Sequence, residues 1–236
     1  IKRKNKRYSI QYSLPVWLVK VLIEEYGEKR ALAIFESLFL RNKASVRVVD
    51  LSRKEELKQL LQAEDSLLAP SALVKSHGHF AGHALFEEGA ITIQDESSQL
   101  VTPTLELRGD EKVLDACSAP GGKTMHIASY LTTGQVTALD LYEHKLALIK
   151  ENAQRLGVAD KVITKKLDAR KVFETFGADA FDKILVDAPC SGIGLIRRKP
   201  DIKYNKENAD FASLQKIQLE ILDSVCQSLR KGGIIT

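Results

Sequence analysis

The most constraining feature of the sequence is a regular alternation of strand-like and helix-like segments from about residue 90 onward. Short apolar runs typical of buried strands are separated by stretches whose apolar residues recur every three or four positions, as on one face of a helix. Strands that alternate with helices form a parallel sheet, because each helix carries the chain back across it. We expect Gly157 and Gly232 to end the second and third of these helices. The predicted strands are 112–116, 135–140, 162–167, 181–187 and 233 onward, and the predicted helices are 123–131, 143–156 and 207–230.

Two shorter regions precede this alternation. Residues 14–41 have the apolar spacing of helices, interrupted at Gly27, and predict two helices. Residues 45–50 alternate like a strand, and residues 52–55 have the pattern of a capping box that opens a helix ending at Leu61. These patterns divide the chain into a helical lead-in, a small α+β region and an α/β domain truncated at its C-terminal end, which we place at residues 1–44, 45–89 and 90–236.

Composition excludes several classes of protein. The apolar runs are far shorter than the roughly 20 residues that a membrane-spanning helix needs, and no secretory signal follows the basic N-terminal segment. Three cysteines without metal-like spacing predict reduced thiols in a cytoplasmic protein: Cys117, Cys190 and Cys226. Three histidines lie close together but without a cysteine or fourth ligand nearby, so no metal site is predicted: His77, His79 and His83.

The segment 113–124 predicts a strand that turns through Gly121 and Gly122 into a helix. Glycines let a ligand approach the backbone closely, and the first turn of a helix offers free N–H groups. A Walker A loop would need glycine at Cys117, and a dinucleotide-binding loop would need a third glycine near His126. Both motifs therefore fit poorly, and a nucleotide hydrolase is retained only as a rival class.

Carboxylates end three of the predicted strands. Asp140 lies about 20 residues beyond the glycine turn, where an acidic residue holds the hydroxyls of an adenosine ribose in sheets of this kind. Asp168 and Asp187 end the next two strands. Each could instead cap a turn or a helix, but open parallel sheets bind ligands at the carboxyl ends of their strands. Their joint placement predicts a ligand site at that edge.

A cysteine follows the fourth predicted strand, in the sequence Asp187-Ala188-Pro189-Cys190-Ser191-Gly192. A thiol in such a loop, beside a carboxylate and near a ligand crevice, is a candidate nucleophile or acid–base group. Cys226 lies within the long predicted helix, and we expect it to be an inert, buried thiol.

Three motifs together resemble the RNA cytosine-5 methyltransferases: residues 93–99, 115–124 and 187–192. The resemblance covers roughly residues 45–236, and residues 197–202, Arg-Arg-Lys-Pro-Asp-Ile, are similar to a segment of the bacterial Sun/Fmu-type enzymes that act on small-subunit ribosomal RNA. It implies a Rossmann-like sheet that binds S-adenosyl-L-methionine. It also implies a separate helical RNA-binding domain in the ribosomal branch, for which residues 14–41 are too short.

The resemblance implies a covalent mechanism. A cysteine thiolate adds to C6 of cytosine, C5 takes the methyl group, and loss of the C5 proton releases the enzyme. In the family the nucleophile lies in a Thr-Cys motif after the fifth strand, which would follow Thr236, so we expect this chain to lack it. Cys190 would then assist release of the product, Asp187 and Lys123 would face the target base, and Asp115 would brace the glycine loop.

The same resemblance implies the residues that contact the cofactor and the RNA. Asp168 would read the adenine amino group, within a cofactor site made of Cys117, Ser118, Ala119, Pro120, Gly121, Gly122, Lys123, Asp140, Asp168 and Asp187. The substrate would be a cytosine splayed out of a folded RNA, which the resemblance identifies as 16S ribosomal RNA, held by Arg47, Arg197, Arg198 and Lys199. The alternatives are a transfer RNA substrate, or a fragment that binds cofactor and RNA without the nucleophile. No sequence feature indicates an oligomeric state.

Overall fold

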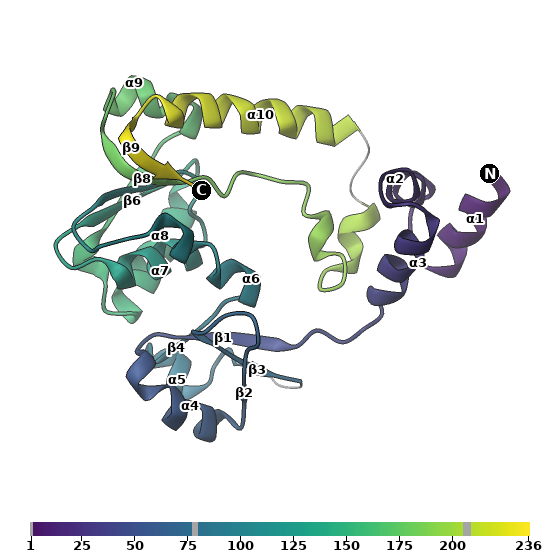
Figure 1. Ribbon diagram of the computed structural model, residues 1–236, viewed down its shortest axis with the longest axis horizontal. Helices are drawn as coiled ribbons and strands as arrows, with labels where there is room; N and C mark the ends of the chain where they lie inside the picture. Colours follow the sequence, from purple (N-terminus) through teal and green to yellow (C-terminus); the bar gives the residue numbers. More distant parts are fainter. Residues whose placement is uncertain (1, 77–79, 205–208) are drawn as a thin grey trace. The chain divides into compact units, whose positions relative to one another are not determined.

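A computed structural model describes residues 2–76, 80–204 and 209–236 and divides the chain into two compact units (Figure 1). Unit 1 combines two segments that are far apart in the sequence, residues 1–42 and 189–217. Unit 2 comprises residues 43–188 and 218–236. In the described part of the chain, no helix is both long enough and apolar enough to cross a membrane.

Unit 1 is helical. It contains α1 (Lys2–Gln11), α2 (Val16–Tyr26), α3 (Glu28–Ser37), the 3-10 helices η5 (Ile193–Leu195) and η6 (Pro200–Tyr204), and the start of α10 (Ala209–Cys226). The predicted break at Gly27 is confirmed, with φ of 73° between α2 and α3. The helix α1 was not predicted, because its sequence is mainly basic. Two of its side chains, Tyr8 and Tyr12, are nevertheless buried in the core of the unit, whose buried members are Tyr8, Tyr12, Leu14, Leu18, Val19, Ala31, Phe35 and Ile196.

Unit 2 contains a five-stranded parallel sheet, which confirms the predicted fold class. Its strands follow the order β7-β6-β5-β8-β9, and β6 (Gln135–Asp140) has the predicted bounds. The other strands are β5 (Lys112–Asp115), β7 (Val162–Lys166), β8 (Phe181–Leu185) and β9 (Leu229–Ile235). The order of the strands reverses at β5, which pairs with both β6 and β8. Ligands of open parallel sheets bind at such a point.

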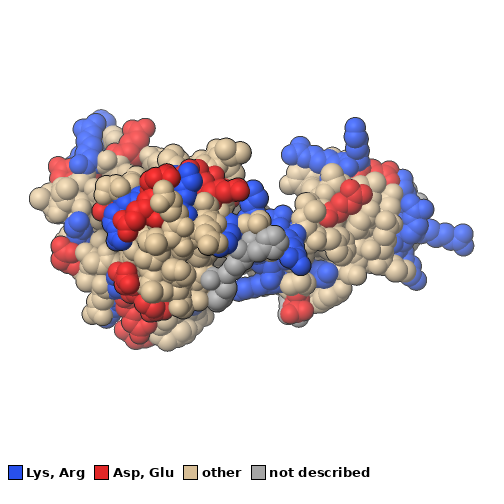
Figure 2. Space-filling model, turned by 90° about the horizontal axis from the view of Figure 1, so that it is seen from below, with Lys and Arg blue, Asp and Glu red and all other residues tan. Residues whose placement is uncertain are grey.

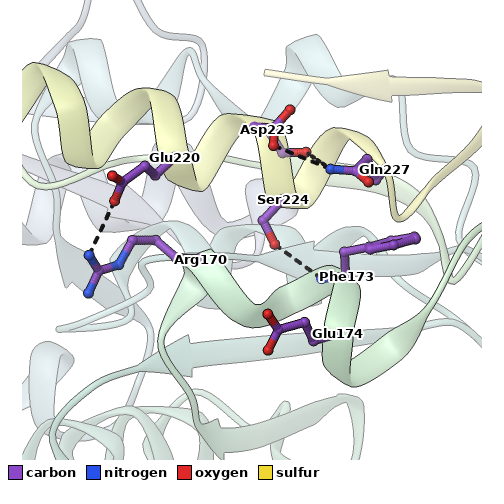
Figure 3. A pocket seen from close by; sticks show the side chains of 7 residues that line it. All are labelled: Arg170, Phe173, Glu174, Glu220, Asp223, Ser224 and Gln227. Carbon is purple, nitrogen blue, oxygen red and sulfur yellow. Dashed lines mark hydrogen bonds and ion pairs between the residues drawn. The ribbon is translucent and has the colours of Figure 1, made fainter.

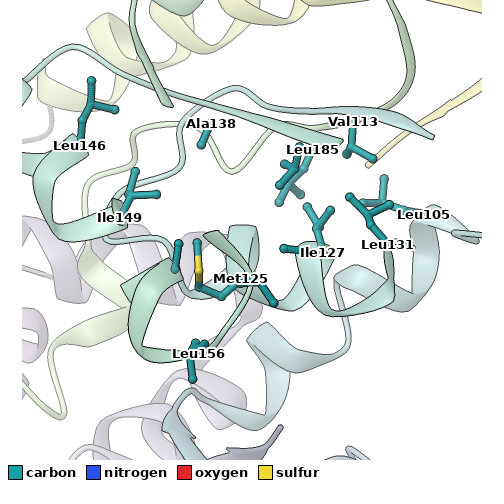
Figure 4. Close-up of a cluster of buried hydrophobic side chains, with 14 residues drawn as sticks. Leu105, Val113, Met125, Ile127, Leu131, Ala138, Leu146, Ile149, Leu156 and Leu185 are labelled. Atoms are coloured by element: carbon teal, nitrogen blue, oxygen red, sulfur yellow. The ribbon is translucent and has the colours of Figure 1, made fainter. Parts of the chain in front are cut away.

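Helices cover both faces of this sheet. Figure 1 shows α7 (Gly122–Tyr130) and α8 (Glu143–Arg155) on one side and α10 on the other; α9 (Val172–Phe176) precedes β8. The core between the sheet and the first pair is built from aliphatic side chains such as Val113, Ile127 and Ile149, each fully buried (Figure 4). This packing fixes where the loops at the carboxyl ends of the strands begin.

The end of α10 differs from the prediction. The helix ends at Cys226 rather than at residue 230, and Gly232 lies inside β9 with φ of 80° instead of closing the helix. The pairing of β8 with β9 shifts register across this stretch. A glycine that allows an irregularity within a strand therefore had the sequence signature of a helix end.

The small α+β region is a four-stranded antiparallel sheet in the order β2-β3-β1-β4. Its elements are β1 (Ala44–Val48), α4 (Lys54–Leu61), β2 (Glu64–Asp65), β3 (Ala72–Lys75), α5 (Ala84–Glu87) and β4 (Ile91–Ile93), so the sheet extends past residue 89. The predicted capping box is wrong: Asp50 accepts the backbone N–H of Ser52 at 2.9 Å and opens a 3-10 turn, η1 (Leu51–Arg53), ahead of α4. The short elements α6 (Glu96–Gln99) and η2 (Thr102–Leu105) lead into β5.

Candidate functional site

The loop after β5 is attached to both neighbouring strands. The backbone N–H of Ala116 donates to the carbonyl of Leu185 in β8 at 3.0 Å. Ser118 donates from its backbone N–H and from its hydroxyl to the carbonyl of Leu139 in β6, at 2.9 and 2.7 Å. These bonds hold the loop over the point where the strand order reverses.

The paired glycines have different roles in the turn into α7. Gly121 has φ of 101°, and a Cβ there would come within 3.3 Å of Ile149. Both the backbone conformation and the close approach of α8 therefore favour glycine at this position. A Cβ on Gly122 would meet nothing within 4 Å. Gly122 thus leaves open space at the first turn of the helix, as close approach of a ligand requires.

Four carboxylates follow one another along the carboxyl edge of the sheet. Asp115 and Asp140 are the last residues of β5 and β6, while Asp168 and Asp187 each follow two residues after β7 and β8. Given the strand order, their sequence along the edge is Asp168, Asp140, Asp115 and Asp187. The structure therefore brings together the three carboxylates that the sequence predicted, with Asp115 between them.

Asp115 is buried, with 1% of its surface exposed. The hydroxyl of Thr124, on α7, donates to its Oδ2 at 2.6 Å. Burial raises the pKa of the Asp115 carboxyl to about 6. The Asp115 side chain thus fastens the start of α7 to the end of β5 through the Thr124 hydroxyl, a contact that the sequence pattern did not predict.

Asp140 and Asp168 also cap the turns that follow their strands. Oδ1 of Asp140 accepts the backbone N–H of Tyr142 at 2.9 Å, and Oδ2 lies 3.8 Å from Nζ of Lys145. Asp168 accepts the backbone N–H of Arg170 at 3.0 Å and opens the 3-10 helix η4 (Ala169–Lys171). Capping and ligand binding are compatible, because a carboxylate can accept about four hydrogen bonds.

Lys123 and Asp187 form an ion pair beside the glycine loop. Nζ of Lys123 lies 2.7 Å from Oδ2 of Asp187, and the lysine side chain is 20% exposed against 56% for the aspartate. The two residues lie on different elements, the first turn of α7 and the segment after β8. The two residues are 64 positions apart in the sequence. By the family resemblance, both are expected to face the target base.

The three cysteines are free thiols in different environments. Burial, together with the charges of all four edge carboxylates, raises the pKa of the half-buried Cys117 thiol to about 12. Cys117 is therefore a protonated thiol at neutral pH and a poor nucleophile. Cys190 is exposed and belongs to unit 1. Cys226 is exposed as well, so the prediction of a buried thiol is wrong: its position on α10 faces solvent.

The raised pKa of the Cys117 thiol indicates the sign of the electrostatic potential at this edge of the sheet. A thiol whose ionisation is opposed by four carboxylates lies in a region of negative potential. Such a region favours a cationic ligand group over an anionic one. It is a poor place for the phosphates of a nucleotide, in agreement with the poor fit of both phosphate-binding motifs.

Arg47 is buried, which contradicts the predicted contact with RNA. Only 2% of its surface is exposed, and its Nε donates to Oε1 of Gln94 at 2.9 Å. Burial lowers the pKa of the guanidinium to about 10. The pKa of the His126 imidazole is lowered to about 3, chiefly because His126 is itself buried and secondly because of the charge of Arg47. The prediction was wrong because both faces of β1 are covered, so that the alternating pattern has no solvent face.

The other predicted RNA contacts are exposed and lie in unit 1: Arg197, Arg198 and Lys199. Arg197 donates from Nε to Oδ1 of Asn42, which ties this segment to the end of the N-terminal helices. Of the predicted histidine group, His77 and His79 lie outside the described residues, and His83 caps α5 by accepting the N–H of Leu85 at 3.2 Å. Within the described ranges, no three potential metal ligands come together.

Charge is divided unequally between the units. Unit 1 contains 15 lysine and arginine residues against 7 aspartate and glutamate residues, a net charge of +8. Unit 2 contains 20 against 24, a net charge of −4. Figure 2 shows lysine and arginine side chains prominent over unit 1. The net charge of +4 is therefore the sum of a strongly basic helical unit and an acidic unit 2.

Known proteins resemble this chain over most of its length. The family model described as 16S rRNA methyltransferase RsmB/F matches residues 102–236. A Bacillus subtilis protein named probable ribosomal RNA small subunit methyltransferase B is 45% identical, covering 98% of this chain and 53% of that protein. A Vibrio vulnificus protein named ribosomal RNA small subunit methyltransferase B is 37% identical, covering 95% and 54%. The chain thus spans about half the length of these curated relatives.

A solved structure shares the fold. The crystal structure of a methyltransferase homolog protein from Pyrococcus horikoshii has a TM-score of 0.82 to this chain at 26% sequence identity. The match covers 100% of this chain and 76% of the other.

Proposed function

The chain belongs to the 16S rRNA methyltransferase RsmB/F family, and from this premise we propose that it binds S-adenosyl-L-methionine and serves methylation of C5 of a cytosine in 16S ribosomal RNA. The names of the relatives, which refer to the ribosomal small subunit, favour ribosomal RNA over the alternative, transfer RNA. The proposal places the protein with its RNA in the cytoplasm.

The observation that supports this proposal most strongly is the row of four carboxylates beside an open glycine turn. S-adenosyl-L-methionine supplies a methyl group on a sulfonium cation, and the negative potential at Cys117 suits that charge. Asp140, with 11% of its side chain exposed, is the acceptor for the ribose hydroxyls. Asp168 is the acceptor for the adenine amino group. Gly121 and Gly122 give the cofactor access to the backbone.

The ion pair of Lys123 and Asp187 is proposed to hold the target base. The ammonium group is a donor and the carboxylate an acceptor, so together they can recognise the polar edge of a cytosine. The base must leave its stack to reach them. By the family resemblance, Asp187 and Lys123 are catalytic residues alongside Cys190.

Cys190 is proposed to assist release of the methylated product rather than to attack the base. The attacking thiol belongs, by the family resemblance, to a Thr-Cys motif after the fifth strand. That strand is β9, and all three cysteines of this chain precede it. We therefore assign the nucleophile to none of them, and we propose that the 236 residues by themselves bind cofactor and RNA.

Cofactor binding is tested by calorimetric titration with S-adenosylhomocysteine. We expect the wild-type chain to bind it and Asp140→Ala to lose at least about tenfold in affinity, because two ribose hydroxyls lose their acceptor. Asp160→Ala, an exposed aspartate at the start of a 3-10 turn, is the matched control and should bind normally. Equal affinity of Asp140→Ala and wild type would remove Asp140 from the site. Thermal stabilisation by ATP but not by S-adenosylhomocysteine would instead favour the rival nucleotide hydrolase.

A further inference from the structure

Asp168 is held by a single arginine through both of its carboxylate oxygens. Oδ1 accepts the backbone N–H of Arg170 at 3.0 Å and its Nε at 3.1 Å. Oδ2 accepts Nη2 of the same residue at 2.7 Å and Nε at 3.1 Å. The guanidinium of Arg170 thus folds back onto the residue that caps its own turn, and the carboxylate cannot rotate without breaking several bonds at once.

Arg170 is in turn anchored to another element. Its Nη1 donates to Oε2 of Glu220 on α10 at 3.2 Å (Figure 3). Four residues further along α10, the hydroxyl of Ser224 accepts the backbone N–H of Phe173 at 3.1 Å, which fixes α9 to the same helix. These residues line a groove of about 360 Å³ in unit 2, in which Figure 3 shows Arg170 reaching across to Glu220. A continuous chain of contacts therefore runs from α10 to Asp168.

Asp168 can still accept a ligand N–H, because one N–H group of Arg170 is shared between its two oxygens. A carboxylate offers about four lone-pair positions, and Arg170 engages both oxygens with three N–H groups, one of them shared. The side chain of Asp168 is still 22% exposed. The arginine also lowers the pKa of the Asp168 carboxyl, chiefly through its side-chain hydrogen bonds. An ionised carboxylate in a fixed orientation accepts an N–H group and repels a carbonyl oxygen.

We propose that Arg170, braced by Glu220, is a positioning residue that makes Asp168 selective for an amino group at position 6 of the purine of the cofactor. This inference rests on the proposed function, in which Asp168 contacts the adenine. It adds that selectivity depends on a residue that need not touch the cofactor, and that α10 contributes to it. Arg170 was not predicted from the sequence. The pattern that could have indicated it is an arginine two residues after Asp168, the aspartate that follows β7.

The test compares two ligands that differ at that position. S-adenosylhomocysteine has an amino group on C6 of the purine, and S-inosylhomocysteine has a carbonyl oxygen there. We expect the wild-type chain to prefer the amino form and Arg170→Met to lose about tenfold in affinity for it, with little change for the inosine form. The ratio of the two affinities is the informative quantity, because general damage to the fold would weaken both ligands equally. Arg170 is 45% exposed, so the substitution should leave the fold intact.

Three further variants sharpen the result. Lys171→Met removes a neighbouring exposed charge whose attraction for the Asp168 carboxylate is weaker than that of Arg170, and it should leave the ratio unchanged. Glu220→Gln should lower the ratio by less than Arg170→Met, and adding it to Arg170→Met should have no further effect, because the two residues act through one path. Asp168→Asn reverses part of the hydrogen-bonding pattern and should abolish the preference.

The outcomes separate this inference from the proposed function. If Arg170→Met keeps the wild-type ratio while Asp168→Asn loses it, Asp168 reads the purine unaided and the inference is wrong. If Asp168→Asn also keeps the ratio while S-adenosylhomocysteine still binds, Asp168 does not contact the purine, and the inference is again wrong although cofactor binding stands. Failure of the wild-type chain to bind S-adenosylhomocysteine would overturn the proposed function itself.

Discussion

Among the residues of the site, Asp115 has the largest consequence for pH. Its pKa in the folded chain is about 6, against an ordinary value of 3.8, because the carboxyl is buried. The folded state therefore keeps this proton to a higher pH than the unfolded state, and ionising the group costs stability. At about 1.4 kcal/mol per pKa unit, the cost reaches about 3 kcal/mol once the pH has risen through the window from about 4 to 6.

We predict that Asp115→Asn removes this cost. The amide oxygen can still accept the Thr124 hydroxyl, but it does not ionise. Urea unfolding at pH 4.5 and pH 7.5 should show the variant gaining about 2 kcal/mol of stability relative to wild type between these two pH values, because part of the cost is already present at pH 4.5. A difference between variant and wild type that is the same at both pH values would show that Asp115 does not titrate in this window.

The role of Cys190 can be separated from that of a nucleophile. In a longer form of the protein that contains a Thr-Cys motif after β9, we predict that Cys190→Ala still bonds to C6 of the cytosine and accumulates as a protein–RNA adduct. An attacking thiol is required before the adduct forms, and a releasing thiol only afterwards. A denaturing gel with labelled RNA and S-adenosylmethionine distinguishes them. Absence of a retarded band, with the fold intact, would make Cys190 the attacking residue.

At the same scale, residue types predicted which carboxylates lie along the edge of the sheet better than they predicted individual side-chain contacts. The aspartates at the ends of β6, β7 and β8 were identified because a carboxylate at a strand end can be recognised from pattern alone. Arg47 was assigned to RNA from the family resemblance, whereas the structure covers both faces of its strand. Whether a charged side chain is buried depends on packing between distant segments, which a local pattern does not contain.

Among the elements, the C-terminal end of α8 is fixed against the small sheet. Arg155 donates from Nη1 to the carbonyl of Phe86 at 2.6 Å, and its guanidinium lies 3.9 Å from the centroid of the Phe86 ring. Gly89, with φ of 76°, approaches so closely that a Cβ would overlap the backbone carbonyl of Arg155. This contact joins the small sheet to the parallel sheet within unit 2.

We predict that Gly89→Ala destabilises the chain by at least about 3 kcal/mol, since it combines backbone strain with a clash against a fixed carbonyl. Gly157→Ala is the matched control. Gly157 has φ of 69° at the end of α8, but a Cβ there would meet nothing within 4 Å. It should cost only the strain, about 1 to 2 kcal/mol. Equal destabilisation in chemical denaturation would show that the close approach at Gly89 relaxes without cost.

The elements predicted well are those whose pattern is local and repeated. The strand β6 and the helices α7 and α8 were predicted to within a residue at each end, because their apolar spacing continues over the whole element. The helix α1 was missed because its buried side, which includes Tyr8 and Tyr12, is narrow and lies among basic residues. The strands β3 and β4, with four and three residues, are too short for any periodicity to be recognised.

For the whole molecule, the unequal charge of the two units predicts where RNA binds. A polyanion is attracted to unit 1, with its net charge of +8, and repelled by the net negative charge of unit 2. The exposed residues Arg197, Arg198 and Lys199 belong to the basic unit. The carboxyl edge of the sheet, with its four carboxylates, belongs to the acidic unit.

We predict that replacing Arg197, Arg198 and Lys199 with alanine weakens RNA binding and lowers the slope of affinity against salt by up to about 0.9 for each phosphate that is no longer neutralised. Filter binding across a range of salt concentrations measures both quantities. The control removes three exposed lysines of unit 2: Lys150, Lys165 and Lys166. If both triple variants weaken RNA binding equally, only the total charge matters. If the salt slope of the first variant is unchanged, residues 197–199 form a solvated loop that does not contact RNA.

Because unit 1 is assembled from two separate segments, its completion depends on the order of synthesis. Residues 1–42 are synthesised before residues 189–217, and Ile196, which contributes to their core, follows residue 42 by more than 150 residues. During that interval the apolar sides of α2 and α3 are without part of their covering and are available to chaperones. The strands β5 to β8 are translated within the same interval. Four strands of the parallel sheet are therefore synthesised before the basic unit can close.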